Sequence, residues 1–240
     1  MTDDMIDEAL QFGDVHNAKL YKALADEGLL KLFLPKEFGG EERSRVDMAI
    51  FQETMGYYEA PLGGYGSTLG IVGRSLILFG NEKQKKEILP KIAQGEVICC
   101  IGITEPNAGS DAASVETYAE DIGDKLKVNG TKIFITNANI SKYILALVRT
   151  DKNLEKHKGL SLLLIDLELP GVKINPLKTM SNWIVNEVVF EDVLVDKENL
   201  LGGKNRGWEI LNKTLQEERT GLGTIRNIKK IFEELLEFAK

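Results

Sequence analysis

A loop with ligand-binding chemistry ends the stretch Ile101–Asp111, where an apolar strand runs into the letters TEPNAGSD. Pro106 restricts one φ angle, and Gly109 permits a backbone conformation that other residues resist. The hydroxyls of Thr104 and Ser110, with outward backbone NH groups, can donate hydrogen bonds to carbonyl or anionic oxygens of a ligand. Taken alone, the same letters equally fit an Asx-rich turn between two strands. The stretch is a candidate ligand loop whose meaning depends on the rest of the chain.

A second stretch, Asn129–Asn137, has the letters NGTKIFITN. Both stretches closely resemble the flavin-binding signatures of the acyl-CoA dehydrogenase family, and the resemblance extends over nearly the whole chain. Further matching segments, in the family's order, are Leu34–Gly40, Phe79–Lys85, Leu89–Ile92, Pro170–Val172, Glu187–Val193 and Asn199–Gly202. Several weak motifs in the right order make a strong joint signal. The resemblance implies FAD as the cofactor.

The resemblance also implies roles for individual residues. In the family, the residue matching Thr104 donates to the N1 and C2 carbonyl edge of the flavin, which becomes electron-rich when N5 accepts a hydride. The hydroxyl matching Thr136 meets N5, and Phe134 stands where many members carry a tryptophan packed against the ring. Without the resemblance, these would be ordinary strand threonines and a core phenylalanine. The other implied cofactor-binding residues are Ile101, Ile103, Gly109, Ser110 and Ile135.

The helix predicted from Asn205 to Gly221 carries a carboxylate on its apolar face. At about 100° per residue, Glu218 lies on the same side as Leu211 and Leu215, whereas Glu217 points to the solvated side. An unpaired carboxylate among leucines has a pKa raised toward the range that a general base needs. Neutralisation of Glu218 by an adjacent arginine or by a partner chain is the structural alternative.

Family resemblance bears on the substrate-binding residues as well. In a subgroup resembling isovaleryl-CoA dehydrogenase, the base that removes the substrate α-proton precedes the arginine that matches Arg219. In the larger part of the family, that base lies further along the chain. Arg219 is implied to approach the CoA portion, which suits its fixed guanidinium fork. Glu218 is therefore the candidate catalytic base, and Ser110 and Arg219 are the candidate substrate-binding residues.

Apolar spacing predicts helices before residue 97 and strands after it. Helices are predicted at Val15–Leu32, from Ser44 with a capping box to Asp47, at Ser67–Phe79 and at Glu82–Ile92. Asn129-Gly130 is the strongest short hairpin signal, between strands at 125–128 and 132–135. Further strands are predicted at Tyr143–Arg149, Leu160–Leu167, Val172–Asn175 and Asn186–Phe190. The predicted fold is α+β, with an N-terminal helical domain at 1–96, a middle antiparallel β domain at 97–203 and the start of a truncated C-terminal helical domain at 204–240.

Composition argues against several classes of site. The 240 residues carry a formal net charge of -7, so no nucleic-acid partner is expected. The apolar runs are strand-sized, and Met1–Asp4 is acidic where a secretory signal is basic, which predicts a cytoplasmic protein without membrane contact. With only His16 and His157 in the chain, neither a metal site nor Ser-His catalysis is expected. Cys99 and Cys100 are adjacent in a strand and point to opposite faces, so we expect buried free thiols.

The end of the chain predicts a partner. Two helices form stripes that further helices cover in the family. The first stripe consists of Trp208, Leu211, Leu215 and Leu222, and the second of Ile225, Ile228, Phe232 and Leu235. Bare stripes of this size exceed what a soluble monomer tolerates. We therefore expect a second chain that supplies the remaining helical domain within a larger symmetric assembly, or a homo-oligomer that buries the stripes against themselves.

Three functions are open. The first is an FAD-dependent acyl-CoA dehydrogenase subunit of fatty acid metabolism, in which Glu218 or a partner's carboxylate removes the α-proton, the β-hydride passes to the flavin, and an electron-transfer flavoprotein reoxidises it. The second is a non-catalytic subunit of a heteromeric acyl-CoA dehydrogenase. The third is a flavin oxidase or monooxygenase of the same fold. Phe134, Thr136 and Glu218 together favour the first.

Overall fold

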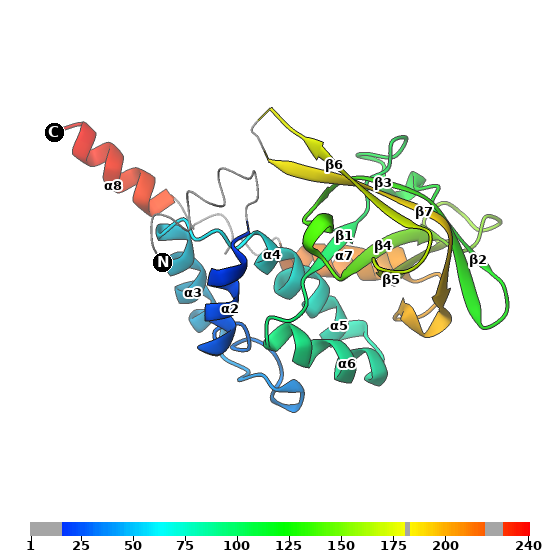
Figure 1. Ribbon diagram of the computed structural model, residues 1–240, viewed down its shortest axis with the longest axis horizontal. Coiled ribbons are helices and arrows are strands. Elements are labelled where there is room, and N and C mark those ends of the chain that lie inside the picture. Colours follow the sequence, from blue (N-terminus) through cyan, green and yellow to red (C-terminus); the bar gives the residue numbers. More distant parts are fainter. Residues whose placement is uncertain (1–15, 181–182, 219–227) are drawn as a thin grey trace.

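The computed structural model describes residues 16–180, 183–218 and 228–240. The helices are α2 (Ala18–Asp26), α3 (Arg45–Tyr57), α4 (Gly63–Tyr65), the π-helix η2 (Gly66–Gly73), α5 (Arg74–Phe79), α6 (Glu82–Ala93), α7 (Gly207–Glu218) and α8 (Ile228–Phe238). The strands are β1 (Cys99–Gly102), β2 (Tyr118–Asp121), β3 (Lys125–Thr136), β4 (Tyr143–Arg149), β5 (Leu160–Asp166), β6 (Val172–Lys178), β7 (Ile184–Asp196) and β8 (Leu200–Leu201). Short 3-10 turns lie at η1 (Lys36–Phe38), η3 (Ala112–Ser114), η4 (Ala138–Ile140) and η5 (Lys197–Asn199). The predicted order of helices, strands and helices is confirmed (Figure 1).

Two helices begin at capping boxes. The Ser44 hydroxyl accepts a hydrogen bond from the Asp47 backbone NH at 3.2 Å, and the Asp47 carboxylate accepts one from the Ser44 NH at 3.0 Å. Asn81 and Gln84 form the same reciprocal pair at the start of α6. The predicted start of α3 is therefore confirmed, and α6 ends one residue later than predicted.

Two other predicted helices differ from the structure in extent or in type. Of the helix predicted at Val15–Leu32, Val15 lies outside the described residues, and the observed α2 begins at Ala18 and stops at Asp26, because Gly28 takes a left-handed conformation with a φ of 73°. The helix predicted at Ser67–Phe79 is confirmed as part of a continuous helical run that ends at Phe79, but its first part is the π-helix η2. Glycine-rich segments accept the wider π turn, which apolar periodicity does not reveal.

Within the described residues, the strands form one eight-stranded sheet with the order β6-β7-β3-β2-β4-β5-β8, and β1 pairs with β4 off this path. Neighbouring strands are antiparallel as predicted, except that β1 and β2 lie parallel to β4. Helix α7 packs against β5 and α5, so it joins the sheet to the helical part (Figure 1).

The predicted hairpin at Asn129-Gly130 is wrong, because both residues lie inside the continuous strand β3. Gly130 has a φ of 146°, and a Cβ there would lie 2.6 Å from the Thr117 Cα, so this position needs glycine for close backbone approach. The Asn129 side chain both donates to and accepts from Asp192 on β7. The real turn joins β2 to β3 around Gly123, whose φ is 95°. Tertiary pairing thus overrides a local turn signal.

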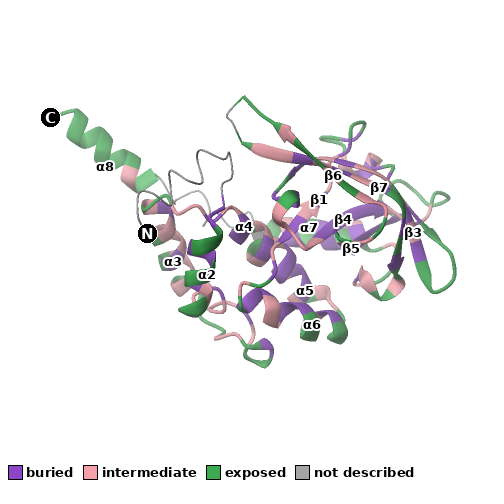
Figure 2. Cartoon of the chain, viewed as in Figure 1, coloured by how far each residue is buried: buried purple, intermediate pink, exposed green. Residues whose placement is uncertain are grey.

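The two cysteines lie in two different cores, as expected for neighbours in a strand. Cys99 packs in the core between the sheet and the helices, and Cys100 in the core on the other face of the sheet. Both thiols are free and buried, which confirms the prediction. Burial raises the pKa of both, that of Cys100 to about 12. Figure 2 shows buried residues concentrated in the central strands and on the helix faces next to them.

The predicted apolar stripes have different outcomes on α7 and α8. On α7, Leu211 is buried, and Trp208 and Leu215 pack partly against the core, so the prediction that these three residues are bare is wrong. This part of the stripe is covered because α7 packs against β5 and α5. Leu222 and Ile225 lie outside the described residues. On α8 the stripe is bare, as predicted, and the helix lies at one end of the molecule (Figures 1 and 2). Its exposed apolar residues are Ile228, Ile231, Phe232, Leu235, Leu236 and Phe238.

Candidate functional site

The two stretches with ligand-binding chemistry lie side by side. The backbone NH of Ile133 donates to the Thr104 carbonyl at 2.9 Å. One residue earlier, the Lys132 Nζ donates to the Ile103 carbonyl at 3.2 Å. Residues 103 and 104 are therefore held beside the segment that contains Phe134, although the two stretches are far apart in sequence.

Phe134 projects from the sheet at a β-bulge. The register of β3 against β7 shifts between Lys132 and Ile135, and Phe134 has a φ of 59°, which is uncommon for a non-glycine residue. The Phe134 side chain is 62% exposed, whereas that of Ile135 is buried. The alternative that Phe134 is an ordinary core residue is wrong, and Ile135 can reach a ligand only through its backbone. Residues in sparsely populated φ regions cluster at functional sites.

Two asparagines hold the backbone that follows the bulge. Asn137 has a φ of 63°, and its Nδ2 donates to the Gly63 carbonyl at 2.8 Å, at the start of α4. Asn186 on β7 is fully buried, and its Nδ2 donates to the Ile135 carbonyl at 2.9 Å. Thr136 lies between these anchored residues and is exposed. The backbone is therefore fixed while the Thr136 hydroxyl remains accessible.

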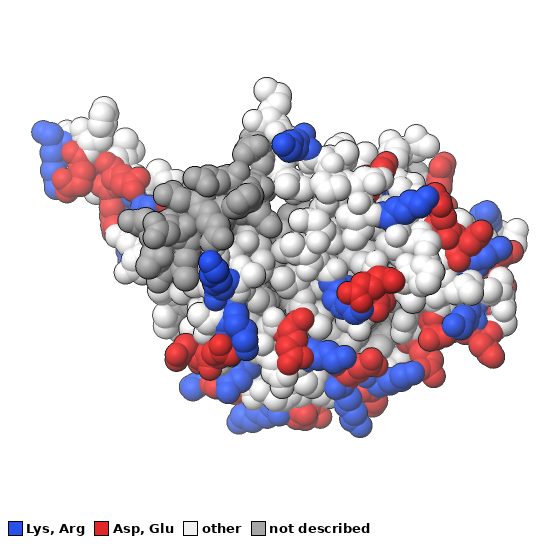
Figure 3. Space-filling model, viewed as in Figure 1, with Lys and Arg blue, Asp and Glu red and all other residues white. Residues whose placement is uncertain are grey.

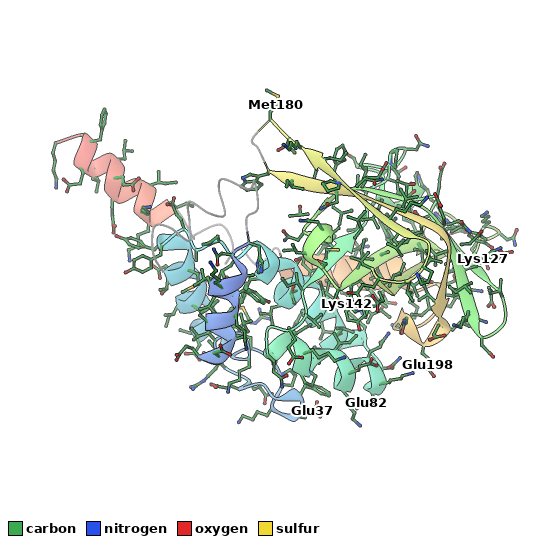
Figure 4. The ribbon with its side chains drawn as sticks, in the orientation of Figure 1. Glu37, Glu82, Lys127, Lys142, Met180 and Glu198 are labelled. Carbon is green, nitrogen blue, oxygen red and sulfur yellow. The ribbon has the colours of Figure 1, made fainter. Side chains whose placement is uncertain are left out.

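An exposed aromatic lies next to the start of the neighbouring strand. Thr136 pairs with Val185 on β7, and Trp183 immediately precedes the first residue of that strand, Ile184. Trp183 is 54% exposed. The hairpin that carries it ends near Met180, at the outer tip of the sheet in Figure 4. Sequence reasoning missed Trp183, because only the register of β3 against β7 places it near Thr136.

A tight turn closes the first stretch. The Glu105 NH donates to the Ala108 carbonyl at 2.9 Å, and the Ala108 NH donates to the Glu105 carbonyl at 3.1 Å. Pro106 lies at the exposed tip. Gly109 is not among the glycines with positive φ, and a Cβ there would meet nothing within 4 Å. The prediction that Gly109 supplies an unusual backbone conformation is therefore wrong, since Pro106 and the backbone pair form the turn.

The remaining residues of the first stretch lie on both sides of this turn. Ile101 and Ile103 pack partly against the core between sheet and helices, so each presents little side chain to a ligand. Ser110 is exposed beyond the turn. The adjacent Asp111 pairs with Lys156 and accepts a hydrogen bond from Ser114, and these partners hold the pKa of Asp111 below its usual value.

A buried ion pair lies behind the two stretches, and sequence reasoning missed it. The Lys132 Nζ lies 2.7 Å from the Glu105 carboxylate, and the two residues are 0% and 5% exposed. Burial lowers the pKa of Lys132 to about 8, although the Glu105 charge opposes this shift. The alternation of β3 contained a signal, because Lys132 has the same parity as the buried Leu126 and Val128.

The predicted base stands at the end of the described part of α7. Glu218 is the last residue of that helix, and its side chain and the whole of Arg219 lie outside the described residues. The preceding turn is anchored by Thr214, whose hydroxyl lies 2.9 Å from the Ser75 hydroxyl on α5. Helix α7 is therefore anchored to the core up to the turn that precedes Glu218.

Among the described residues, His, Cys, Asp and Glu side chains form no group of three that could hold a metal ion, and no helix has the length and apolar character of a membrane span. Lys, Arg, Asp and Glu side chains are intermixed around the lower edge of the view in Figure 3. The centre of that view carries few charges. The exposed aromatic and hydroxyl groups described above are thus the best candidates for ligand contact.

The chain has a helical part followed by a sheet with an exposed bulge, and this architecture agrees with the family to which it is similar. Residues 3–96 match the family model described as acyl-CoA dehydrogenase, N-terminal domain, and residues 100–193 match acyl-CoA dehydrogenase, middle domain. Acyl-CoA dehydrogenase FadE29 of Mycobacterium tuberculosis is 35% identical over 238 residues, which make up 97% of this chain and 61% of that relative.

Solved structures agree with these matches. The Tcur3481-Tcur3483 steroid ACAD is 31% identical with a TM-score of 0.88, over 97% of this chain and 62% of that chain. The ChsE4-ChsE5 complex from Mycobacterium tuberculosis is 31% identical with a TM-score of 0.78, over 85% of this chain and 52% of that chain. The protein belongs to the acyl-CoA dehydrogenase family. It spans at most 62% of the length of these three relatives.

Proposed function

We propose that this chain holds FAD in an acyl-CoA dehydrogenase that removes hydrogen from the α and β carbons of an acyl-CoA thioester. The observation that carries the proposal is the joining of the two stretches, in which the Ile133 NH donates to the Thr104 carbonyl at 2.9 Å beside the exposed Phe134. An aromatic side chain held outward by a left-handed residue costs free energy unless something packs on it. A flat heteroaromatic ring is a suitable partner.

The residue types fit a flavin. An isoalloxazine ring needs an apolar face on one side and hydrogen-bond donors along its N1 and C2 edge and at N5. Phe134 offers the face, and Thr104 and Thr136 offer donors on a fixed backbone. Ser110 offers a further hydroxyl for the pyrophosphate. The residues proposed to hold FAD are Ile101, Ile103, Thr104, Gly109, Ser110, Phe134, Ile135 and Thr136, with Ile135 acting through its backbone.

The mechanism divides between these residues and the end of α7. Bound FAD supplies an acceptor for the hydride that leaves the β-carbon. Thr104 and Thr136 donate hydrogen bonds where negative charge develops, and Phe134 excludes water from one face of the site. The Glu218 carboxylate accepts the α-proton as general base. Ser110 and Arg219 orient the CoA portion, so that the α-proton faces Glu218.

A second chain is proposed to complete the site. The bare apolar face of α8 calls for a protein partner. Two similar solved structures carry paired protein names, Tcur3481-Tcur3483 and ChsE4-ChsE5, which favours a heteromer over a homo-oligomer. An electron-transfer flavoprotein is the proposed electron acceptor, and the proposed setting is cytoplasmic fatty acid metabolism. The proposed division of the chain remains 1–96, 97–203 and 204–240.

The test is co-expression of this chain with candidate partners, followed by mass measurement of the intact complex and its FAD content. We expect a yellow complex whose flavin absorbance is bleached by acyl-CoA without oxygen. A colourless complex would favour a non-catalytic subunit. A yellow complex that acyl-CoA does not bleach would favour an oxidase or monooxygenase of the same fold.

A further inference from the structure

We propose that Lys132 and Glu105 form a buried clamp that sets the position of the Ile101–Thr104 segment relative to Phe134–Thr136. The clamp would act as a positioning device for the flavin site, so this inference rests on the proposed function. Neither residue is itself proposed to touch FAD or substrate.

The ammonium group of Lys132 joins its own strand to two other segments, the first stretch and β4. It donates to the Ile103 carbonyl at 3.2 Å, to Glu105 Oε1 at 2.7 Å and to the Leu147 carbonyl on β4 at 2.6 Å. Three acceptors satisfy all three protons of a lysine ammonium. Because the side chain is fully buried, none of these bonds competes with solvent. One side chain of β3 thus ties the end of the first stretch to β4.

The carboxylate of Glu105 holds the other side of the turn. Its Oε1 accepts from the Thr117 NH at 3.0 Å as well as from Lys132, and its Oε2 accepts from the Glu116 NH at 2.6 Å. The carboxylate therefore binds the chain that leaves the loop, and the Lys132 ammonium, its ion-pair partner, binds the chain that enters the loop at Ile103. A shift of the loop would break several buried hydrogen bonds at once, which makes the loop position well defined.

The clamp adjoins the bulge directly. Lys132 precedes Ile133, whose NH binds the Thr104 carbonyl, and the register shift against β7 begins after Lys132. A Cβ on Gly102 would lie 2.6 Å from the Ile144 Cδ1 and 3.3 Å from the Lys132 Cγ, so Ile144 and the lysine stem together fill the space beside residue 102. Lys132 therefore holds the first stretch against β3 and also precedes the point at which the register of β3 against β7 shifts.

Stability alone is a weak explanation for this pair. A buried ion pair commonly stabilises a fold no more than well-packed apolar residues of similar volume do, whereas removal of one partner leaves a costly unpaired charge. Directional bonds to three backbone segments specify geometry, which an apolar replacement cannot do. Folding and positioning can therefore be separated by comparing single variants with a double variant.

The experiment uses the full chain, with its partner if one co-purifies, and compares Lys132→Met, Glu105→Gln, the double variant and Lys127→Met. Lys127 is the matched control, because it lies on the same strand in an exposed pair with Glu120, at the opposite end of the sheet from Met180 (Figure 4). The measurements are the unfolding temperature, the FAD dissociation constant and the absorption spectrum of FAD bound at saturation.

We expect each single variant to lower the unfolding temperature and the double variant to recover most of that loss. The double variant should still bind FAD about tenfold more weakly than wild type, since oriented hydrogen-bond donors are displaced. Its bound flavin should show a shifted spectrum, and Lys127→Met should match wild type in every measurement. Wild-type FAD affinity and spectrum in the double variant would overturn the clamp. A double variant that does not fold would also overturn it, because the pair would then serve folding itself. Absence of FAD binding in wild type and in Lys127→Met would instead contradict the proposed function.

Discussion

Two lysine–glutamate pairs of equal length lie in two different regions of the molecule. At the bulge, Lys132 and Glu105 approach to 2.7 Å and are buried. At the far end, Lys230 on α8 and Glu59 after α3 also approach to 2.7 Å, but their side chains are 32% and 49% exposed. Solvent screens the second pair, and exposed pairs of this kind contribute little to stability. Equal distances therefore conceal very different energetic consequences.

The difference indicates which region is held in place by contacts within this chain. The bulge is fixed by buried hydrogen bonds from three segments, so its geometry is present before any ligand binds. Helix α8 is held to α3 by exposed contacts, including Lys229 with Glu53 at 3.2 Å and the Tyr57 hydroxyl with Glu233 at 3.0 Å, while its apolar face is bare. We infer that the position of α8 depends on what covers it. The following variants test this contrast, beginning with the largest expected effect.

Glu218→Gln asks whether the end of α7 carries chemistry. We expect unchanged FAD content and a loss of α-proton exchange of bound acyl-CoA on the order of 10² to 10⁴-fold, because a general base is removed. Exchange of the α-proton into deuterated water is the measurement, and Glu217→Gln is the control. A wild-type rate of exchange in Glu218→Gln would show that Glu218 is not the base. The base would then be expected on another polypeptide, and α7 would have a structural role.

The stabilities of Lys132→Met and Lys230→Met compare the two regions directly. The first should destabilise the protein by about 3 to 5 kcal/mol, because it leaves the Glu105 charge buried and unpaired. The second should leave the unfolding free energy close to that of wild type, because its partner is exposed. Denaturant unfolding of both variants gives the two values. Equal losses would contradict the contrast drawn here.

Thr136→Ala tests the accessible hydroxyl at the bulge. We expect flavin reduction to slow by on the order of 3 kcal/mol in activation free energy, since one donor to a developing charge is lost. Binding of acyl-CoA should weaken much less. Stopped-flow reduction and equilibrium titration separate the two, and Thr131→Ala on the same strand is the control. Equal losses in binding and reduction would remove Thr136 from the position opposite N5.

Acid should weaken the bulge through Glu105. Burial alone raises the pKa of Glu105, but the charge of Lys132 and the hydrogen bonds from Lys132, Thr117 and Glu116 outweigh it and hold the pKa below its usual value. A carboxylate with a lowered folded-state pKa stabilises the fold above its unfolded-state pKa, and this contribution is lost as the pH falls through the folded-state value.

The gap in unfolding temperature between wild type and Glu105→Gln should therefore be widest at neutral pH and should narrow below a pH of about 4. Unfolding of both proteins across this range is the measurement. Glu59→Gln is the control and should stay close to wild type throughout. A gap that widens in acid would show that Glu105 is not held as a carboxylate.

Local sequence determined the elements whose signals lie within a few residues. The Ser44 capping box starts α3 because its two partners are three positions apart, and the continuous apolar run from Tyr143 to Arg149 predicts β4 residue for residue. The burial of Cys99 and Cys100 on opposite faces of the sheet follows from strand geometry alone. The family resemblance also placed Thr104, Phe134 and Thr136 among the candidate site residues before their neighbours were known.

Tertiary structure decided everything that depends on partners distant in sequence. The local sequence Asn129-Gly130 predicts a hairpin. Close packing of Gly130 on Thr117 and hydrogen bonds between Asn129 and Asp192 instead place both residues in a continuous strand. The exposure of Phe134 results from a bulge against β7, which no period in β3 reveals. Lys132 and Glu105 are 27 residues apart, and only the folding of β3 across the end of β1 brings their charges together in a buried site. Local patterns therefore specified which groups were available, and long-range pairing determined where each one lies.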